Sequence, residues 1–221
     1  MTASHRTASS ANQAYNFIRA QILSGAYGEG MRLTETQISD HLGLSRTPVR
    51  EAMRLLVSDG FLHFQPNSGT FVRTWDAAEV AAVYDARLLV ESELAALAAR
   101  RITPYQLDRM RAIHEQIELQ GADTSEENQV RIEPLNREFH AVIIDSANNP
   151  RMAVMREQAL EIQIIRRTQR RYTPIQLARS FQHHRELLDA LSCNDSDWAR
   201  DIMACHLRSA KLAMLGRQEK E

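Results

Sequence analysis

The stretch Ser45-Arg46-Thr47-Pro48-Val49-Arg50-Glu51-Ala52 decides how the rest of the chain is interpreted. Ser45 is a residue type that favours the cap before a helix. Pro48 is tolerated in the first helical turn because its missing N–H has no intrahelical partner there. Arg46 and Arg50 are four residues apart and therefore lie on one face of that helix. The stretch predicts a helix that presents two arginines at its exposed first turn.

The segments on both sides of this helix predict a DNA-binding arrangement. Upstream, a capping-box pattern at residues 34–37 begins a short amphipathic helix at residues 35–42. Downstream, residues 61–64 and 70–75 have strand-like composition, and Pro66-Asn67-Ser68-Gly69 between them is typical of a turn. A helix, a turn, a second helix and a hairpin follow in the order of a winged helix-turn-helix. The second helix of that motif enters the DNA major groove.

The chain divides into two predicted domains, and its fold class is mostly α. We expect a disordered arm at residues 1–11, a winged helix-turn-helix domain at 12–75 and an all-helical bundle at 76–217. Apolar residues recur at helical spacing over residues 12–24, which predicts the first helix. From residue 76 onward only helical patterns follow, each bounded by Pro, Gly, Asn or Ser. They predict helices at residues 76–101, 104–120, 126–146, 151–171, 174–191 and 195–215.

Composition and charge narrow the class of protein. Of the 221 residues, 43% are hydrophobic and 25% are charged, as in an ordinary globular protein. No apolar run reaches the roughly 18 residues of a membrane span, and the N-terminus lacks the apolar core of a signal peptide. We therefore expect no membrane partner and a cytoplasmic location, which two cysteines also fit. Residues 1–75 carry seven arginines against five acidic residues, a mildly basic head on an acidic remainder.

The predicted recognition helix and hairpin supply the candidate DNA contacts. An arginine such as Arg46 or Arg50 forks onto the O6 and N7 atoms of guanine, which is worth roughly 1–3 kcal/mol of discrimination. The hydroxyls of Ser45 and Thr47 suit phosphate oxygens, and the backbone at Gly69 is able to approach DNA closely. The alternative is a solvated helix start with surface arginines. The complete candidate set is Ser45, Arg46, Thr47, Arg50, Gly69 and Arg73.

A second constellation lies in the predicted helical domain. His140, His184 and His206 fall on the apolar faces of three separate helices, and Asn136 lies one turn before His140. Three imidazoles and one oxygen are suited to hold a divalent cation in a bundle core, and zinc or nickel are the metals we expect first. The alternative is a set of core histidines whose hydrogen bonds are satisfied within the fold. His5, His41, His63, His114 and His183 are expected to be surface or local residues.

The N-terminal part resembles the GntR family of bacterial transcription regulators. The resemblance rests on Ile18-Arg19, Ile22–Tyr27, Gly30, Leu33, Glu35, Leu42–Ala52, Leu55 and Asp59-Gly60. It implies that Ser45, Arg46, Thr47 and Arg50 contact DNA and that Gly69 lies in the wing. The chain has Thr36 where the family often carries an arginine, which favours a shifted operator preference.

The remainder, roughly residues 76–215, resembles the FCD effector domain of the FadR subfamily. The resemblance rests on the segments 135–140, 184–191 and 206–207. It implies a metal held by an Asp or Asn and three histidines, with a small carboxylate effector bound at the metal. Asn136 stands where an aspartate is commoner, and a neutral oxygen leaves the site more positive. Arg87 and Glu91 resemble pocket positions, and Arg87 would pair the effector carboxylate. The alternative for Arg87 is a position on the helix surface or an ion pair within the predicted helix at residues 76–101.

These patterns favour a ligand-responsive transcription regulator of the repressor type over an enzyme. One recognition helix reads too few bases for a useful site, so we expect a homodimer on a palindromic double-stranded operator. One alternative is an architectural DNA-binding dimer without an effector. Another is a zinc hydrolase that uses the three histidines to activate water. No His-Glu-x-x-His run supports the hydrolase.

Overall fold

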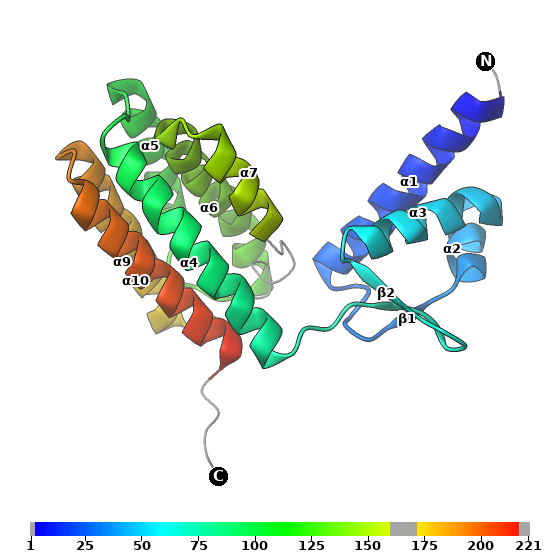
Figure 1. Ribbon diagram of the computed structural model, residues 1–221. Helices are drawn as coiled ribbons and strands as arrows, with labels where there is room; N and C mark the ends of the chain where they lie inside the picture. Colours follow the sequence, from blue (N-terminus) through cyan, green and yellow to red (C-terminus); the bar gives the residue numbers. More distant parts are fainter. Residues whose placement is uncertain (1–2, 160–171, 217–221) are drawn as a thin grey trace, which may run out of the picture. The chain divides into compact units, whose positions relative to one another are not determined.

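The computed structural model describes residues 3–159 and 172–216, and the chain separates into two compact units between Trp75 and Asp76. Figure 1 shows a small unit with a β-hairpin and a larger unit made of helices. The mostly α fold class expected from the sequence is therefore confirmed.

The N-terminal unit is a three-helix core with a small sheet. Its elements in chain order are α1 (Ala3–Ser24), β1 (Arg32–Leu33), α2 (Glu35–Leu42), α3 (Arg46–Ser58), β2 (Leu62–Gln65) and β3 (Gly69–Val72). The strands form one antiparallel sheet in the order β1-β3-β2, with Arg32 opposite Phe71 and Leu62 opposite Val72. β1 was not expected, because a strand of two residues is too short to show an alternating pattern.

Helix α1 begins well before the predicted start. It runs from Ala3 instead of residue 12, so the prediction of a disordered arm at residues 1–11 was wrong for residues 3–11. Ala11 and Ala14 are buried, which ties this part of the helix to the core. Extending a helix that is already nucleated costs little, because only the first turn carries the nucleation penalty. The segment is polar and has no apolar helical pattern, so its composition did not predict that the helix extends through it.

Local signals place the two helices of the helix-turn-helix. Thr34 and Gln37 form the predicted capping box at the start of α2, and Gly43 ends α2 in the left-handed conformation, with φ 65°. Ser45 precedes α3 in an extended conformation, but its side chain makes no capping hydrogen bond. The Ser45 hydroxyl is therefore not engaged by the helix start that it precedes.

The core of this unit follows the predicted apolar faces. Ile18 of α1, Ile38 of α2, and Val49 and Leu56 of α3 are all almost completely buried, and Val72 of β3 covers them. These contacts fix which face of α3 is left for solvent. The side chains of Arg46 and Arg50 lie on that exposed face.

The C-terminal unit is helical throughout its described residues. Its elements are α4 (Ala77–Ala99), α5 (Pro104–Leu119), α6 (Glu126–Ala147), α7 (Pro150–Ala159), α9 (Pro174–Ser192) and α10 (Ser196–Leu215). Side chains Thr103, Ser125, Thr173 and Asp195 cap the starts of α5, α6, α9 and α10. The predicted helix at residues 151–171 corresponds to α7 as far as Ala159, and residues 160–171 lie outside the described part.

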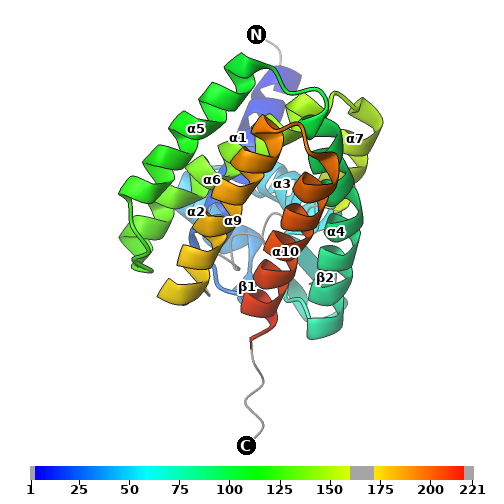
Figure 2. The ribbon, with the colours of Figure 1, turned by 90° about the vertical axis from the view of Figure 1, so that its left-hand side faces the viewer.

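Helix α4 is the central element of this unit. It packs against α6, α7, α9 and α10, and Figure 2 shows it directly beside α10. Alanines in its second half are fully buried and allow neighbouring helices to approach closely. A helix buried on several sides is able to hold polar side chains away from water. None of the described helices combines the length and apolar character that a membrane span requires.

The burial of α3 generates a paired test. We expect Leu56→Ala to lower the unfolding free energy of the N-terminal unit by about 2–5 kcal/mol, because Leu56 is 0% exposed and its removal leaves a cavity. Urea unfolding of the full chain gives the change, and hydrogen exchange shows whether the loss lies in residues 3–75. The adjacent Leu55→Ala is the control, since Leu55 is 50% exposed. Equal effects of the two changes would contradict this packing.

Candidate functional site

The exposed face of α3 carries the candidate DNA-reading side chains. Ser45, Arg46, Thr47 and Arg50 are all exposed at the first turns of this helix. Arg50 is held by α2, because its Nε and Nη2 atoms each donate a hydrogen bond of 2.7 Å to the carboxylate of Glu35. These hydrogen bonds lower the pKa of Glu35 and keep it charged. The pair fixes the direction of Arg50 before DNA arrives.

The β2–β3 hairpin forms the wing, and Gly69 begins its second strand. Gly69 has φ +114°, a conformation that L side chains rarely adopt, and a Cβ atom there would lie 3.1 Å from Nε of Arg32. The Arg32 guanidinium therefore lies over the glycine, where no side chain obstructs it. Arg73 lies below the wing with its guanidinium 5.4 Å from the Trp75 ring centre. Arg32 was absent from the predicted set, since an isolated arginine on a two-residue strand gives no sequence signal.

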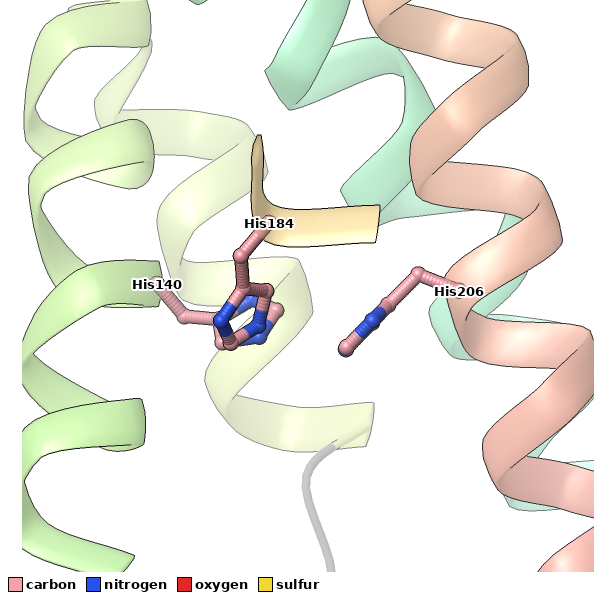
Figure 3. Close-up of side chains that lie close together, drawn as sticks. All are labelled: His140, His184 and His206. Atoms are coloured by element: carbon pink, nitrogen blue, oxygen red, sulfur yellow. The ribbon is translucent and has the colours of Figure 1, made fainter. Parts of the chain in front are cut away.

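The three predicted histidines meet in the core of the helical unit. Figure 3 shows His140 of α6, His184 of α9 and His206 of α10 converging from three helices. One nitrogen from each imidazole lies within 4.8 Å of the other two, and all three residues are buried. In a tetrahedral zinc site with bonds of about 2.0–2.1 Å, the nitrogens are about 3.3 Å apart. Small side-chain rotations would therefore close the cluster around an ion.

The protonation state of the cluster suits metal binding. Burial lowers the pKa of His140 to about 3, and the positive charges of Arg156 and Arg87 add to this effect. Burial and the neighbouring imidazoles lower the pKa values of His184 and His206 well below the usual value. Neutral imidazoles offer the lone pair that a metal requires.

Unmet hydrogen-bonding capacity in the cluster also fits a metal. Both ring nitrogens of His184 and Nδ1 of His206 are buried without a hydrogen-bond partner among the described residues. A buried polar atom without a partner costs about 1–3 kcal/mol. A satisfied core histidine would show partners at these nitrogens, so the cluster departs from that alternative. Asn136, the predicted oxygen donor, is half-buried on α6 one turn before His140.

Arg87 lies beside this cluster but already has a partner. Its Nε donates a hydrogen bond of 2.7 Å to Oε1 of Glu91, one turn later on α4, and both side chains are buried. The other carboxylate oxygen of Glu91 lies 4.0 Å from Nδ1 of His140, and Nε of Arg156 lies 3.8 Å from Oε1. Burial raises the pKa of Glu91, but the charges of Arg87 and Arg156 outweigh it and the pKa is lowered. The alternative for Arg87, an ion pair within helix α4, is thus realised in this structure.

Two further histidines, which were expected to be surface or local residues, lie beside the cluster. His114 of α5 is 4% exposed, and its ring centre lies 5.8 Å from that of His184. His183 is half-buried, with its ring 5.9 Å from that of His206. His114 follows Met110 by four residues on the buried face of α5, and this spacing is a signal that could have found it. Its Nε2 lies 3.1 Å from Oε1 of Glu118.

The Glu35–Arg50 pair predicts a loss of DNA specificity on mutation. We expect Glu35→Gln to lower the ratio of specific to nonspecific DNA affinity by about two- to fivefold, because an exposed ion pair positions its arginine with about 1 kcal/mol at most. The ratio is measured on an operator selected from a random DNA pool. Glu51→Gln is the control, since it removes the same charge from another exposed position on α3. An equal fall in both variants would show that only charge matters.

The buried histidines predict an acid-sensitive helical unit. In the presence of chelator, the stability of this unit should fall as the pH drops below about 6.5, where histidines of the unfolded chain take up protons. The folded His140, with a pKa of about 3, stays neutral over that range, as do His184 and His206. Each such histidine contributes about 1.4 kcal/mol per pH unit. Urea unfolding at pH 7 and pH 5 measures the slope, and His140→Gln should reduce it. An identical slope in that variant would contradict the assignment.

Comparison with known proteins accounts for both units. The family of bacterial regulatory proteins known as gntR matches residues 10–72, and the FCD domain matches residues 82–209. These matches include the α3 residues in one case and Arg87 with all three histidines in the other. Both families consist of transcription regulators, and the hydrolase alternative finds no relative among these matches.

Individual relatives and a solved structure agree with these families. The chain is 30% identical over 137 residues to the uncharacterized HTH-type transcriptional regulator YdhC of Bacillus subtilis, covering 62% of this chain and 60% of that protein. It is 28% identical to the putative L-lactate dehydrogenase operon regulatory protein of Escherichia coli, covering 86% of this chain and 80% of that protein. The structure of E. coli McbR/YncC is similar with a TM-score of 0.70 and 26% identity, over 90% of this chain and 93% of that one.

Proposed function

Since the chain belongs to the GntR family and carries an FCD domain, it is a DNA-binding transcription regulator, and we propose that its helical domain holds one divalent metal ion and a small organic acid. The observation that carries the proposal is the buried, neutral cluster of His140, His184 and His206, with three ring nitrogens that lack hydrogen-bond partners. Imidazole-rich sites accept zinc and nickel, which are the metals to test first.

Asn136 is the proposed oxygen ligand beside the three histidines. It lies on the same helix as His140, four residues earlier, and residues spaced four apart on a helix share one face. Three neutral imidazoles and a neutral amide contribute no negative charge. A metal site built from them would therefore keep the full positive charge of the ion. When bound, the metal supplies a positive centre with an open position, which favours an anionic oxygen from the effector.

The effector of this proposal is a small carboxylate. A carboxylate oxygen of Glu91 lies 4.0 Å from Nδ1 of His140, and Arg87, the cation that the sequence predicts to meet the effector, is held by Glu91 in this structure. One relative carries a name that refers to the L-lactate dehydrogenase operon. We therefore choose L-lactate as the first acid to test.

The DNA-binding form is proposed to be a homodimer that recognises a palindromic operator. Two copies of α3, related by two-fold symmetry, would read two half-sites through Ser45, Arg46, Thr47 and Arg50. Gly69, Arg32 and Arg73 would support the wing against the DNA backbone. Release of the operator on effector binding would make the protein a repressor.

Coupling between the two sites is proposed to run through α4. This helix holds Arg87 and Glu91, and its N-cap residue, Asp76, directly follows Trp75, the last residue of the winged unit. A rigid helix that joins an effector site to a DNA-binding unit provides one element that both ligands are able to bias. The ratio of the effector's affinities for the DNA-free and DNA-bound forms then sets how strongly the effector weakens DNA binding.

Metal content tests the helical half of the proposal. We expect about one zinc or nickel ion per chain by elemental mass spectrometry and loss of the ion in His184→Ala, because His184 is one of three nitrogen ligands. His63→Ala is the control, since His63 is exposed on β2 in the other unit. A metal-free wild-type protein after incubation with zinc and nickel would contradict the site and favour the architectural alternative.

Operator binding tests the other half. We expect Arg46→Ala to weaken specific binding by about 5- to 160-fold, which corresponds to the roughly 1–3 kcal/mol of one guanine contact. Titration of a selected operator measures this loss, and circular dichroism checks the fold. Arg131→Ala is the control, because Arg131 is an exposed arginine on α6. Wild-type affinity in Arg46→Ala would remove this residue from the recognition surface.

A further inference from the structure

A buried arginine and a half-buried one face a single carboxylate next to the histidine cluster. Oε1 of Glu91 receives the hydrogen bond from Arg87 at 2.7 Å and also lies 3.8 Å from Nε of Arg156 on α7. The distance to Arg156 is too long for a hydrogen bond. Two guanidinium groups thus face one carboxylate, which leaves one positive charge in excess.

Arg156 carries that excess charge. Its side chain is only 17% exposed, and its Nε is buried without a hydrogen-bond partner among residues 3–159 and 172–216. Glu157, the nearest acidic residue on α7 itself, is exposed. Buried donors on charged groups almost always have acceptors, because a donor left without one loses its hydrogen bonds to water and gains none in return. Within the part of the chain that the structure describes, the ion pair of this half-buried cation is the 3.8 Å contact with Glu91, whose carboxylate Arg87 already holds through a direct hydrogen bond.

A purely structural role does not account for this arrangement. Arg87 already neutralises Glu91 through a direct hydrogen bond on the same helix. A second arginine that served only to neutralise Glu91 would be expected to donate to it directly.

We propose that Arg156 binds an anionic oxygen of the effector, so that the effector must carry a carboxylate on the α7 side of the histidine cluster. The inference rests on the proposed function and adds a binding residue and a charge requirement to it. Arg156 acts as a hydrogen-bonding cation for the ligand, while Arg87 remains paired with Glu91. A neutral amide of the same size and shape would leave Arg156 without its anion.

Matched ligands and matched variants test this role. The probes are acetate, L-lactate and succinate, with acetamide and L-lactamide as neutral counterparts at equal ionic strength. Calorimetry and thermal shift are recorded on zinc-treated full-length protein, and zinc content is measured in parallel. The variants are Arg156→Gln, the charge-retaining Arg156→Lys, and Arg151→Gln as control. Arg151 is an exposed arginine near the start of the same helix.

We expect at least one carboxylate, and neither amide, to bind the wild-type protein and Arg151→Gln. Arg156→Gln should bind that carboxylate at least about tenfold more weakly with unchanged zinc content, and Arg156→Lys should recover part of the loss. Equal affinity in Arg156→Gln and wild type would overturn the proposal, as would equal binding of an amide. If the protein binds zinc but none of the carboxylates, the role of Arg156 is overturned and the proposed metal site still stands. If a zinc-free protein binds a carboxylate and the binding depends on Arg156, the role of Arg156 is supported and only the metal site is refuted.

Discussion

The buried carboxylate of Glu91 is the constraint on which the helical unit depends. A charge removed from water is tolerated only when opposite charges and hydrogen bonds compensate it. Here α4 supplies the closest partner, Arg87, α7 supplies Arg156, and α6 brings His140 to the other oxygen. One side chain thus links three helices around one point. The central position of α4 follows from the same requirement, because only a helix enclosed by others keeps this group dry.

The histidine cluster is a second buried polar group, and it is left incomplete by the protein alone. His184 is stacked on Phe139, with ring centres 4.3 Å apart, so its orientation is set by apolar packing. Its nitrogens gain nothing from that packing. Buried ring nitrogens without partners among the described residues carry a free-energy cost, which binding of the proposed metal ion would offset. In the winged unit the same logic applies at the surface, where Glu35 orients Arg50 and leaves one edge of the guanidinium available.

Local signals were sufficient for most of the secondary structure. Caps at Thr34, Thr103 and Thr173 begin helices where the sequence predicted them, and the apolar face of α3 is buried as its spacing required. The errors have physical causes. The start of α1 was misplaced because tertiary burial of Ala11 overrides a polar composition, and β1 was missed because pairing with β3 creates it. His114 was assigned to the surface or a local role, although its spacing from Met110 placed it on the buried face.

The sequence by itself determined the two-part architecture, the exposed arginines of α3 and the identities of the three inward histidines. Each of these depends on the spacing of residues along single helices, which can be read directly from the amino-acid sequence. Only the tertiary structure decided that the histidines come within 4.8 Å of one another, that Arg87 is committed to Glu91, and that Arg156 stands beside them without a hydrogen-bond partner at Nε. These relations join helices far apart in the chain, and side-chain distances between them are set by packing, which no local pattern encodes.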